Sequence, residues 1–136
     1  FPGIVVDKHS IGGINGRATM IVVPIIANTK LMMPKTSSRA ITSPAGTADS
    51  MEVLSNVIFD KDRFKEIVLK HHGIIAWGGG FSLAPVDDKI IKIEYPLSLD
   101  PQGQVIASVL AKKYAVGSKH VVIDIPVGEE TKVRTI

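Results

Sequence analysis

Short apolar runs alternate with longer amphipathic segments along the chain. Continuous apolar runs predict buried strands at residues 4–6, 31–35, 74–77 and 120–127. Helical spacing and helix-start signals predict helices at residues 17–28, 47–55, 60–72 and 100–116. This alternation indicates an α/β fold, with a mixed, largely parallel sheet flanked by helices on both faces. Ligands of such sheets lie beyond the C-terminal ends of the strands, so the segments that follow the strands are the most informative.

Three helix boundaries carry specific signals. Asp49, with Glu52 three residues later, has the acidic start of a capping pair. Gly73 is predicted to stop the helix over residues 60–72. Asp100 is predicted to be the N-cap of the last helix, with Pro101 at its first helical position.

Composition narrows the class of protein. The chain has 136 residues, 45% hydrophobic and 21% charged, which is the balance of one globular domain. It contains no cysteine, which excludes disulfides, thiolate zinc sites and cysteine nucleophiles and is compatible with a reducing, cytoplasmic location. The longest apolar run, residues 20–27, is too short to span a bilayer, so we predict no membrane association. Because the chain has no initiator Met, we expect it to be a piece of a longer protein.

Charge and aromatic content point to a small anionic ligand. The formal net charge is +3 and aromatic residues make up 5% of the chain. A surface that stacks single-stranded nucleic acid needs repeated aromatic side chains, and a duplex-binding surface needs a basic run. We therefore predict no nucleic-acid partner.

The first candidate site follows the first strand, at residues 7–13 (Asp-Lys-His-Ser-Ile-Gly-Gly). Glycines let the backbone approach an anion, and the amides at a helix start attract negative charge. Lys8 adds a positive charge and Ser10 a hydroxyl donor. The segment either binds an anion or is a glycine turn with a surface lysine.

The second candidate site follows the next strand, at residues 36–47, where six hydroxyl side chains and Arg39 precede a predicted helix start. Phosphate oxygens accept hydrogen bonds from such donors, and the helix N-terminus adds partial positive charge. On its own, such a segment is more typical of a solvated polar loop with a Thr/Asp helix cap. Two such segments after two strands of one sheet favour a cradle for phosphate or a phosphosugar.

Further candidates lie in the second half of the chain. Asp100 is either a general acid or base, or only a helix cap. Ser108 and Lys112 share a helix face, and they either contact substrate or are a tolerated small serine and, like Lys113, a solvated lysine. Asp87 and Asp88 are either Mg²⁺ ligands or a solvated helix start.

The adjacent histidines at positions 71 and 72 cannot share a helix face. We therefore predict no metal site there, and no metal or organic cofactor for the protein.

Several of these motifs together resemble one family. They are Asp-Lys-His-Ser-x-Gly-Gly at residues 7–13, Pro-Lys-Thr-Ser-Ser-Arg at 34–39, Gly-Thr-x-Asp at 46–49 and Leu-Ser-Leu-Asp-Pro at 97–101. In this order they resemble the thymidine (pyrimidine nucleoside) phosphorylase family and, more closely, its AMP phosphorylase branch. The resemblance covers essentially the whole chain. It implies the catalytic-domain fold shared by nucleoside phosphorylases and phosphoribosyltransferases. It also implies that residues 1–136 are one fragment of that domain, with the family's helical domain and C-terminal part absent.

The resemblance also implies an activity, the phosphorolysis of nucleoside 5′-monophosphates with inorganic phosphate as co-substrate. It implies a homo-oligomer, a dimer or larger, for the full-length protein. By position it implies Asp100 as proton donor, with His9 as the rival. It implies that the residues that bind the nucleotide are Gly12, Ser38, Arg39, Ala40, Ile41, Thr42, Ser43, Thr47, Ser108 and Lys132. It implies a phosphate cradle of Lys8, Ser10, Thr19, Ser37 and Thr47.

Three alternatives stay open. The first is a thymidine or pyrimidine nucleoside phosphorylase, although residues 42–46 depart from that family's Gly-His-Thr-Gly-Gly and no arginine stands near Ile93 or Tyr95. The second is an anthranilate-type phosphoribosyltransferase, which would use Asp87 and Asp88 for Mg²⁺. The third is a non-catalytic nucleotide-binding module.

Overall fold

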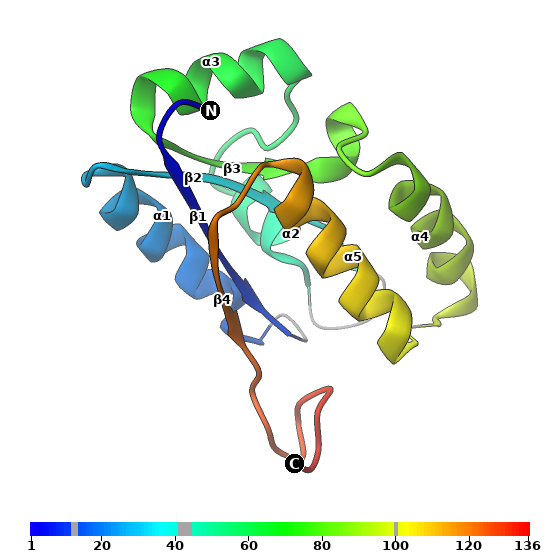
Figure 1. Cartoon of the computed structure of the whole chain (residues 1–136). Helices are drawn as coiled ribbons and strands as arrows, with labels where there is room; N and C mark the ends of the chain where they lie inside the picture. Colours follow the sequence, from blue (N-terminus) through cyan, green and yellow to red (C-terminus); the bar gives the residue numbers. More distant parts are fainter. Residues whose placement is uncertain (12–13, 41–44, 100) are drawn as a thin grey trace.

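The structure is a computed structural model that describes residues 1–11, 14–40, 45–99 and 101–136. Its centre is a four-stranded sheet of order β3-β2-β1-β4, in which every pairing between strands is parallel (Figure 1). The strands are β1 (Ile4–Ser10), β2 (Leu31–Ser37), β3 (Gly73–Trp77) and β4 (His120–Asp124). The predicted α/β fold with a largely parallel sheet is confirmed.

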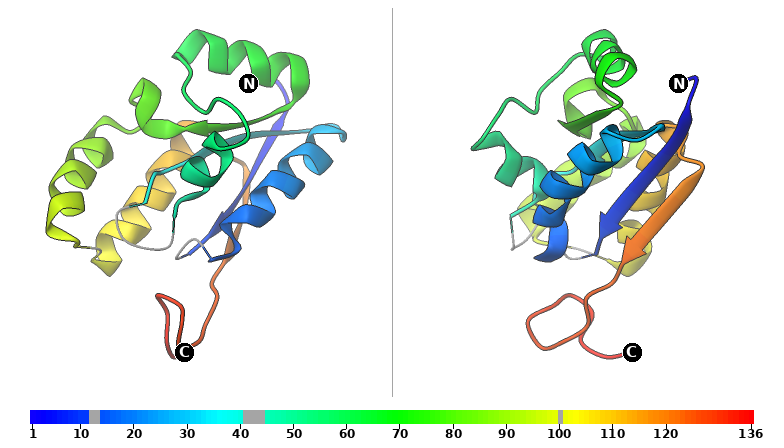
Figure 2. Two further views of the ribbon diagram at one scale, coloured as in Figure 1. Left: turned by 180° about the vertical axis from the view of Figure 1, so that it is seen from behind. Right: turned by 90° about the vertical axis from the view of Figure 1, so that its left-hand side faces the viewer.

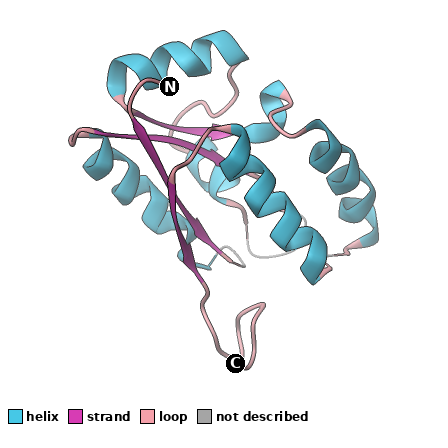
Figure 3. Cartoon of the chain, viewed as in Figure 1, coloured by secondary structure: helices cyan, strands magenta, loops and turns pink. Residues whose placement is uncertain are grey.

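Helices flank this sheet (Figure 3). The α-helices are α1 (Thr19–Ala27), α2 (Thr47–Glu52), α3 (Lys61–His71), α4 (Pro85–Leu97) and α5 (Gln102–Ala115). Two short 3-10 helices, η1 (Ile14–Ala18) and η2 (Gly78–Phe81), follow β1 and β3. No helix among the described residues is long and apolar enough to cross a membrane.

Helices cover both faces of the sheet at β3. The prediction of a buried strand at 120–127 is wrong, because β4 is an edge strand on which Val121, Val122 and Ile123 are exposed. A Cβ added at Gly73 would stand 2.9 Å from the Cβ of Ala27, so this residue of β3 faces α1. The next residue, Ile74, belongs to the buried cluster that contains Phe64 and Val68 of α3. Because successive strand residues point to opposite faces, α1 and α3 lie on opposite sides of β3 (Figure 2).

The two central strands separate towards their C-terminal ends. β1 pairs with β2 at two positions, Ile4↔Leu31 and Val5↔Met32, but with β4 at five positions as far as Ser10↔Asp124. Figure 1 shows β1 and β4 turning away from β2 and β3. This divergence opens the middle of the sheet at the edge where ligands of parallel sheets bind.

Three strand ends differ from the sequence prediction. β2 continues past Lys35 to Ser37, because Thr36 and Ser37 pair with β3. The first strand continues past Val6 to Ser10, because β4 pairs with its polar residues and because Asp7 and Ser10 are buried. The last strand ends at Asp124, before the predicted end at Val127.

The helices also differ in detail. His72, rather than Gly73, takes the left-handed conformation that ends α3, with a φ of 60°, and Gly73 already opens β3. Pro101 is the N-cap of α5, so the helix begins one residue later than predicted. Asp100 lies outside the described residues. Helix α4 was not among the predicted elements, although its first turn contains the acidic pair of Asp87 and Asp88.

Candidate active site

The end of β1 presents an ammonium group beside a hydroxyl. Lys8 Nζ donates to Ser10 Oγ, and Ser10 Oγ donates to Asp124 Oδ2 over 2.9 Å. Burial lowers the pKa of Lys8, while the charge of Asp124 opposes that shift and Lys113 adds to it. Two of the predicted phosphate ligands, Lys8 and Ser10, are therefore adjacent at the C-terminal end of β1.

The segments that follow β1 and β2 meet at the same edge of the sheet. Gly16 of η1 lies so close to Thr47 of α2 that a Cβ at Gly16 would stand 2.5 Å from Thr47 Oγ1. Ser37 ends β2 at this edge, where its Oγ donates to the Ser38 carbonyl oxygen over 3.2 Å. Thr19 is buried at the first position of α1. The two candidate sites after the first two strands thus form one rim, as predicted.

A single carboxylate organises the hydroxyl-rich loop. Asp49 Oδ2 accepts hydrogen bonds from the amide of Ala40 over 2.8 Å and from the amide of Gly46 over 2.9 Å. The chain also closes tightly here, because a Cβ at Gly46 would stand 2.6 Å from the Ser38 carbonyl oxygen. Asp49 caps α2, but as the third helical residue that accepts from the amide of the N-cap Gly46; the predicted capping pair of Asp49 with Glu52 is wrong, because Glu52 binds Arg39. The same Asp49 side chain joins Ala40 to Gly46.

Arg39 is held by acidic side chains and by an indole ring. Its guanidinium donates to both carboxylate oxygens of Glu52, over 2.5 and 2.7 Å, and to Asp49 over 3.1 Å. Its Cζ lies 4.8 Å from the ring centroid of Trp77. Hydrogen bonds to Glu52 raise the pKa of Arg39 above its usual range. A ligand of Arg39 would therefore compete with Glu52 for the same N–H donors.

A hollow of about 660 Å³ lies between this loop, α4 and α5. Predicted nucleotide-binding residues of the loop line it together with residues of both helices. They include Ser38, Arg39, Ala40, Asp88, Tyr95 and Lys112. The hollow is the place where residues predicted from two separate motifs come together.

Lys112 is buried rather than solvated, because it takes part in a network between α4 and α5. Its Nζ donates to Asp87 and, over 2.8 Å, to Ser108 Oγ. Gln104 Nε2 donates to the other oxygen of Asp87 over 3.2 Å. Lys112 and Asp87 are each 5% exposed. The alternatives of a solvated lysine and a solvated acidic helix start are wrong for these two residues, while the predicted Ser108–Lys112 pairing is confirmed.

A second ionic group joins β1, β2 and α5, and no local sequence pattern predicts it. Lys113 Nζ lies 2.7 Å from Asp7 Oδ2 as an ion pair, and Lys35 Nζ lies 3.7 Å from Asp7 Oδ1. The amide of Lys8 also donates to Asp7 Oδ1 over 2.7 Å. Burial and the charge of Lys113 lower the pKa of Lys35 to about 7, against the opposing effect of Asp7. The expectation of a solvated lysine is wrong for Lys113 too, which is 4% exposed.

His9 lies among these cations. Burial, followed by the charges of Lys35, Lys113 and two further lysines, lowers its pKa to about 3. The imidazole is therefore neutral at pH 7, where an unperturbed histidine is close to its titration point.

The remaining predicted site residues lie outside the hollow beside α4 or outside the described residues. Lys132 lines a different hollow, of about 560 Å³, between α5 and β4, and burial lowers its pKa. The structure therefore does not bring Lys132 into the hollow that Ser38 and Lys112 line. The predicted residues Gly12, Ile41, Thr42, Ser43 and Asp100 lie outside the described residues.

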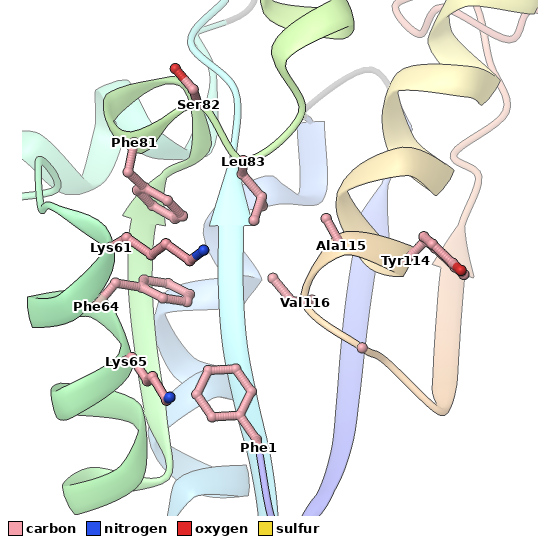
Figure 4. A pocket seen from close by; sticks show the side chains of 11 residues that line it. Phe1, Lys61, Phe64, Lys65, Phe81, Ser82, Leu83, Tyr114, Ala115 and Val116 are labelled. Carbon is pink, nitrogen blue, oxygen red and sulfur yellow. The ribbon is translucent and has the colours of Figure 1, made fainter.

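A third hollow, of about 490 Å³, lies between α3 and α5 and is mostly aromatic and aliphatic (Figure 4). The rings of Phe64 and Phe81 stand 4.8 Å apart in it, and Phe1 meets Phe64 edge-on at 6.4 Å. It contains none of the predicted site residues, so the candidate active site is the rim and the hollow beside α4.

The parallel α/β fold and its family match define the class of this domain as glycosyl-transferring. Residues 2–134 match the family described as "Glycosyl transferase family, a/b domain". The chain belongs to this family.

Three relatives show which members of this family the chain is similar to. The chain is similar to AMP phosphorylase 1 of Archaeoglobus fulgidus, with 58% identity over 98% of this chain and 27% of the relative. It is 56% identical to the AMP phosphorylase of Natronomonas pharaonis, over 98% of this chain and 27% of the relative. It is 57% identical to a protein of Albidiferax ferrireducens named "Putative thymidine phosphorylase", over 98% of this chain and 26% of the relative. The chain spans about a quarter of the length of these relatives.

Proposed function

We propose that this chain supplies the phosphate- and nucleotide-binding part of a pentosyltransferase that phosphorolyses nucleoside 5′-monophosphates. The reaction converts AMP and inorganic phosphate into adenine and ribose 1,5-bisphosphate. The observation that carries the proposal is the meeting of the segments after β1 and β2, where Gly16 lies against Thr47. The similarity to AMP phosphorylases supports the same activity.

The rim suits the charges that this reaction develops. The N-glycosidic bond breaks, the base leaves with the bonding electrons, and a phosphate oxygen bonds to the anomeric carbon. Positive charge grows on the ribose, so a phosphate anion held beneath the sugar stabilises the transition state. The phosphate would be held by Lys8, Ser10, Thr19, Ser37 and Thr47. The ammonium of Lys8 and the hydroxyl of Ser10 already lie together at the edge of the sheet.

The leaving base needs a proton, and we assign its donation to Asp100. The rival donor, His9, has a pKa of about 3, so no imidazolium proton is available from it near neutral pH. An Asp100→Asn variant that retains full activity and an unchanged pH–rate profile would exclude Asp100 from this role.

The rest of the nucleotide would occupy the hollow beside α4. Within the described residues, the predicted nucleotide ligands that line it are Ser38, Arg39 and Ala40. Lys112 also lines the hollow and donates a hydrogen bond to the predicted ligand Ser108. Gly12, Ile41, Thr42, Ser43 and Lys132 stay in the proposed binding set by resemblance alone.

A thymidine phosphorylase is the second candidate, because relatives of similar identity carry that name. A phosphoribosyltransferase that uses Asp87 for Mg²⁺ fits less well. Both oxygens of Asp87 are already hydrogen-bonded, to Lys112 and to Gln104, and a metal would have to displace these donors.

Several attributes of the whole protein belong to the same proposal. They are a cytoplasmic location, a homo-oligomer, catalysis without a cofactor besides the co-substrate phosphate, and residues 1–136 as one fragment of the catalytic domain. A non-catalytic nucleotide-binding role for this segment alone is compatible with the same rim.

Product analysis tests the function. The intact protein that contains this chain is incubated with phosphate and, separately, AMP, CMP, UMP or thymidine. We expect free base and a sugar bisphosphate from the monophosphates, with less or no product from thymidine. Product from thymidine alone would support the second candidate. Base release that requires pyrophosphate and Mg²⁺ would support the phosphoribosyltransferase.

A further inference from the structure

A run of side-chain hydrogen bonds between α4 and α5 ends at the hydroxyl of Ser108. Asp87 of α4 accepts hydrogen bonds from Lys112 Nζ and, over 3.2 Å, from Gln104 Nε2. Lys112 Nζ also donates to Ser108 Oγ over 2.8 Å. Among the described residues, none accepts a hydrogen bond from the Ser108 hydroxyl. The run therefore has one direction, in which Ser108 accepts from Lys112 and keeps its own proton to donate.

The Lys112 side chain is held at both ends. A Cβ at Gly78, which follows β3, would stand 3.7 Å from Lys112 Cε, so the aliphatic stem packs against the end of that strand. The ammonium lies between Asp87 and Ser108, and both Lys112 and Asp87 are buried. A buried ammonium that loses its counter-charge is strongly destabilised, so without Asp87 it would turn towards water. The place of Lys112 Nζ, and with it the hydrogen bond to Ser108, therefore depends on Asp87.

Lys112 lines the hollow beside α4, and Ser108 is half-buried one turn away on the same helix face. A hydroxyl has one donor and two acceptor positions, and an ammonium that occupies one acceptor position strengthens the hydroxyl as a donor. The group of a ligand that meets Ser108 is then a hydrogen-bond acceptor.

We infer that Asp87 is a positioning residue, which acts through Lys112 to orient the Ser108 hydroxyl as a donor to an acceptor atom of the bound nucleotide. Asp87 is not itself a ligand, because both of its oxygens already accept hydrogen bonds from α5. The inference rests on the proposed function, because that function places Ser108 among the groups that bind the nucleotide.

A double-mutant cycle tests whether Asp87 acts through Ser108. The dissociation constant of AMP is measured by calorimetry, in the absence of phosphate, on the intact protein with the natural chain, Asp87→Ala, Ser108→Ala and both substitutions. We expect each single substitution to raise this constant about three- to tenfold, the scale of one hydrogen bond. The double variant should show no larger rise than either single variant. Asp62→Ala is the control and should leave the affinity unchanged, since Asp62 is an exposed carboxylate in the first turn of α3.

Asp87→Asn keeps the shape of the side chain and guards against a loss of folding in the alanine variant. Its amide oxygen still accepts from Lys112 but carries no charge. We therefore expect a smaller rise in the dissociation constant of AMP than in Asp87→Ala, and no rise when Ser108→Ala is already present. The dissociation constant of inorganic phosphate should stay unchanged in all of these variants, whereas a general loss of structure would raise it too.

Effects of the Asp87 and Ser108 substitutions that multiply in the double variants, or an equal loss of phosphate affinity, overturn the inference. If AMP binds equally tightly to the natural chain and to both Asp87 variants, the inference fails while the proposed function stands. If the two substitutions are coupled while no nucleotide is phosphorolysed, the inference stands and the proposed reaction does not. A natural chain that binds no AMP overturns both.

Discussion

Gly16 and Thr47 lie in direct contact across the rim of the sheet, although 30 residues separate them in sequence. A Cβ at Gly16 would stand 2.5 Å from Thr47 Oγ1, which is closer than such atoms approach in proteins. One residue follows β1 and the other opens the helix after β2, so this contact fixes the segments proposed to bind the anion relative to each other.

Substitution of Gly16 by alanine therefore displaces the Thr47 hydroxyl. We expect Gly16→Ala to raise the KM for phosphate by about tenfold, the effect of one lost hydrogen bond to an anion, with a smaller change in the KM for the nucleotide. Steady-state kinetics at varied phosphate measure this. Gly103→Ala is the matched control, because nothing lies within 4 Å of a Cβ at Gly103 on α5. An equal effect of both substitutions would show that the contact does not shape the site.

The buried charges at Asp7 account for part of the stability of the domain. We expect Asp7→Asn to lower the free energy of unfolding by about 3–5 kcal/mol, because Lys35 and Lys113 are left buried without their counter-charge. Denaturant titration measures the loss. Glu66→Gln, which breaks the exposed pair with Arg63, is the control and should cause no measurable change. A loss in Asp7→Asn no larger than in the control contradicts the account.

The burial of these lysines could not be predicted from the sequence. The four strands and their common ligand-binding edge follow from local apolar patterns, and the hydroxyl-rich loop follows from its composition. Whether Lys113 is solvated depends on Asp7, which lies 106 positions earlier and reaches it only after β1 and α5 have packed. No local pattern carries that information.

The same limit applies to boundaries and to α4. Asp7 looks like the end of a strand, but its pairing with β4 carries the strand on to Ser10. Gly73 looks like a helix stop, but His72 takes the left-handed turn and leaves Gly73 free to pack against α1. The acidic pair that begins α4 is compatible, from its sequence alone, with Mg²⁺ ligands or a solvated helix start, whereas α5 supplies the partners that bury Asp87.

Asp49 should matter more than Glu52 for nucleotide binding, although both bind Arg39. Asp49 also accepts hydrogen bonds from the amides of Ala40 and Gly46, so Asp49→Ala releases both ends of the loop. We expect this variant to raise the KM for the nucleotide by about tenfold or more, on the scale of two lost charged hydrogen bonds. Glu52→Gln, which weakens only the contact to Arg39, should change it far less. The reverse order of effects would sink this explanation of the loop.

His9 should make the stability of the domain depend on pH in the acid range. Its pKa falls from an unfolded value of 6.5 to about 3 in the folded chain, so the unfolded state binds one more proton between these values. Stability therefore decreases as pH falls from 6.5 towards 3, by up to about 1.4 kcal/mol per pH unit. Unfolding free energies of the natural chain and of His9→Asn over this range measure the effect. A natural chain with the same pH slope as the variant would contradict a neutral buried imidazole.

The central claim is that the segments after β1 and β2 hold the same phosphate. The most direct measurement is the dissociation constant for inorganic phosphate in Lys8→Met, Thr47→Val and the double variant, determined by calorimetry on the intact protein. Each single substitution should weaken phosphate binding by about tenfold or more, and the double variant should bind no phosphate measurably. If substitution in either segment leaves the phosphate affinity unchanged, the two segments do not form one site and the account is wrong.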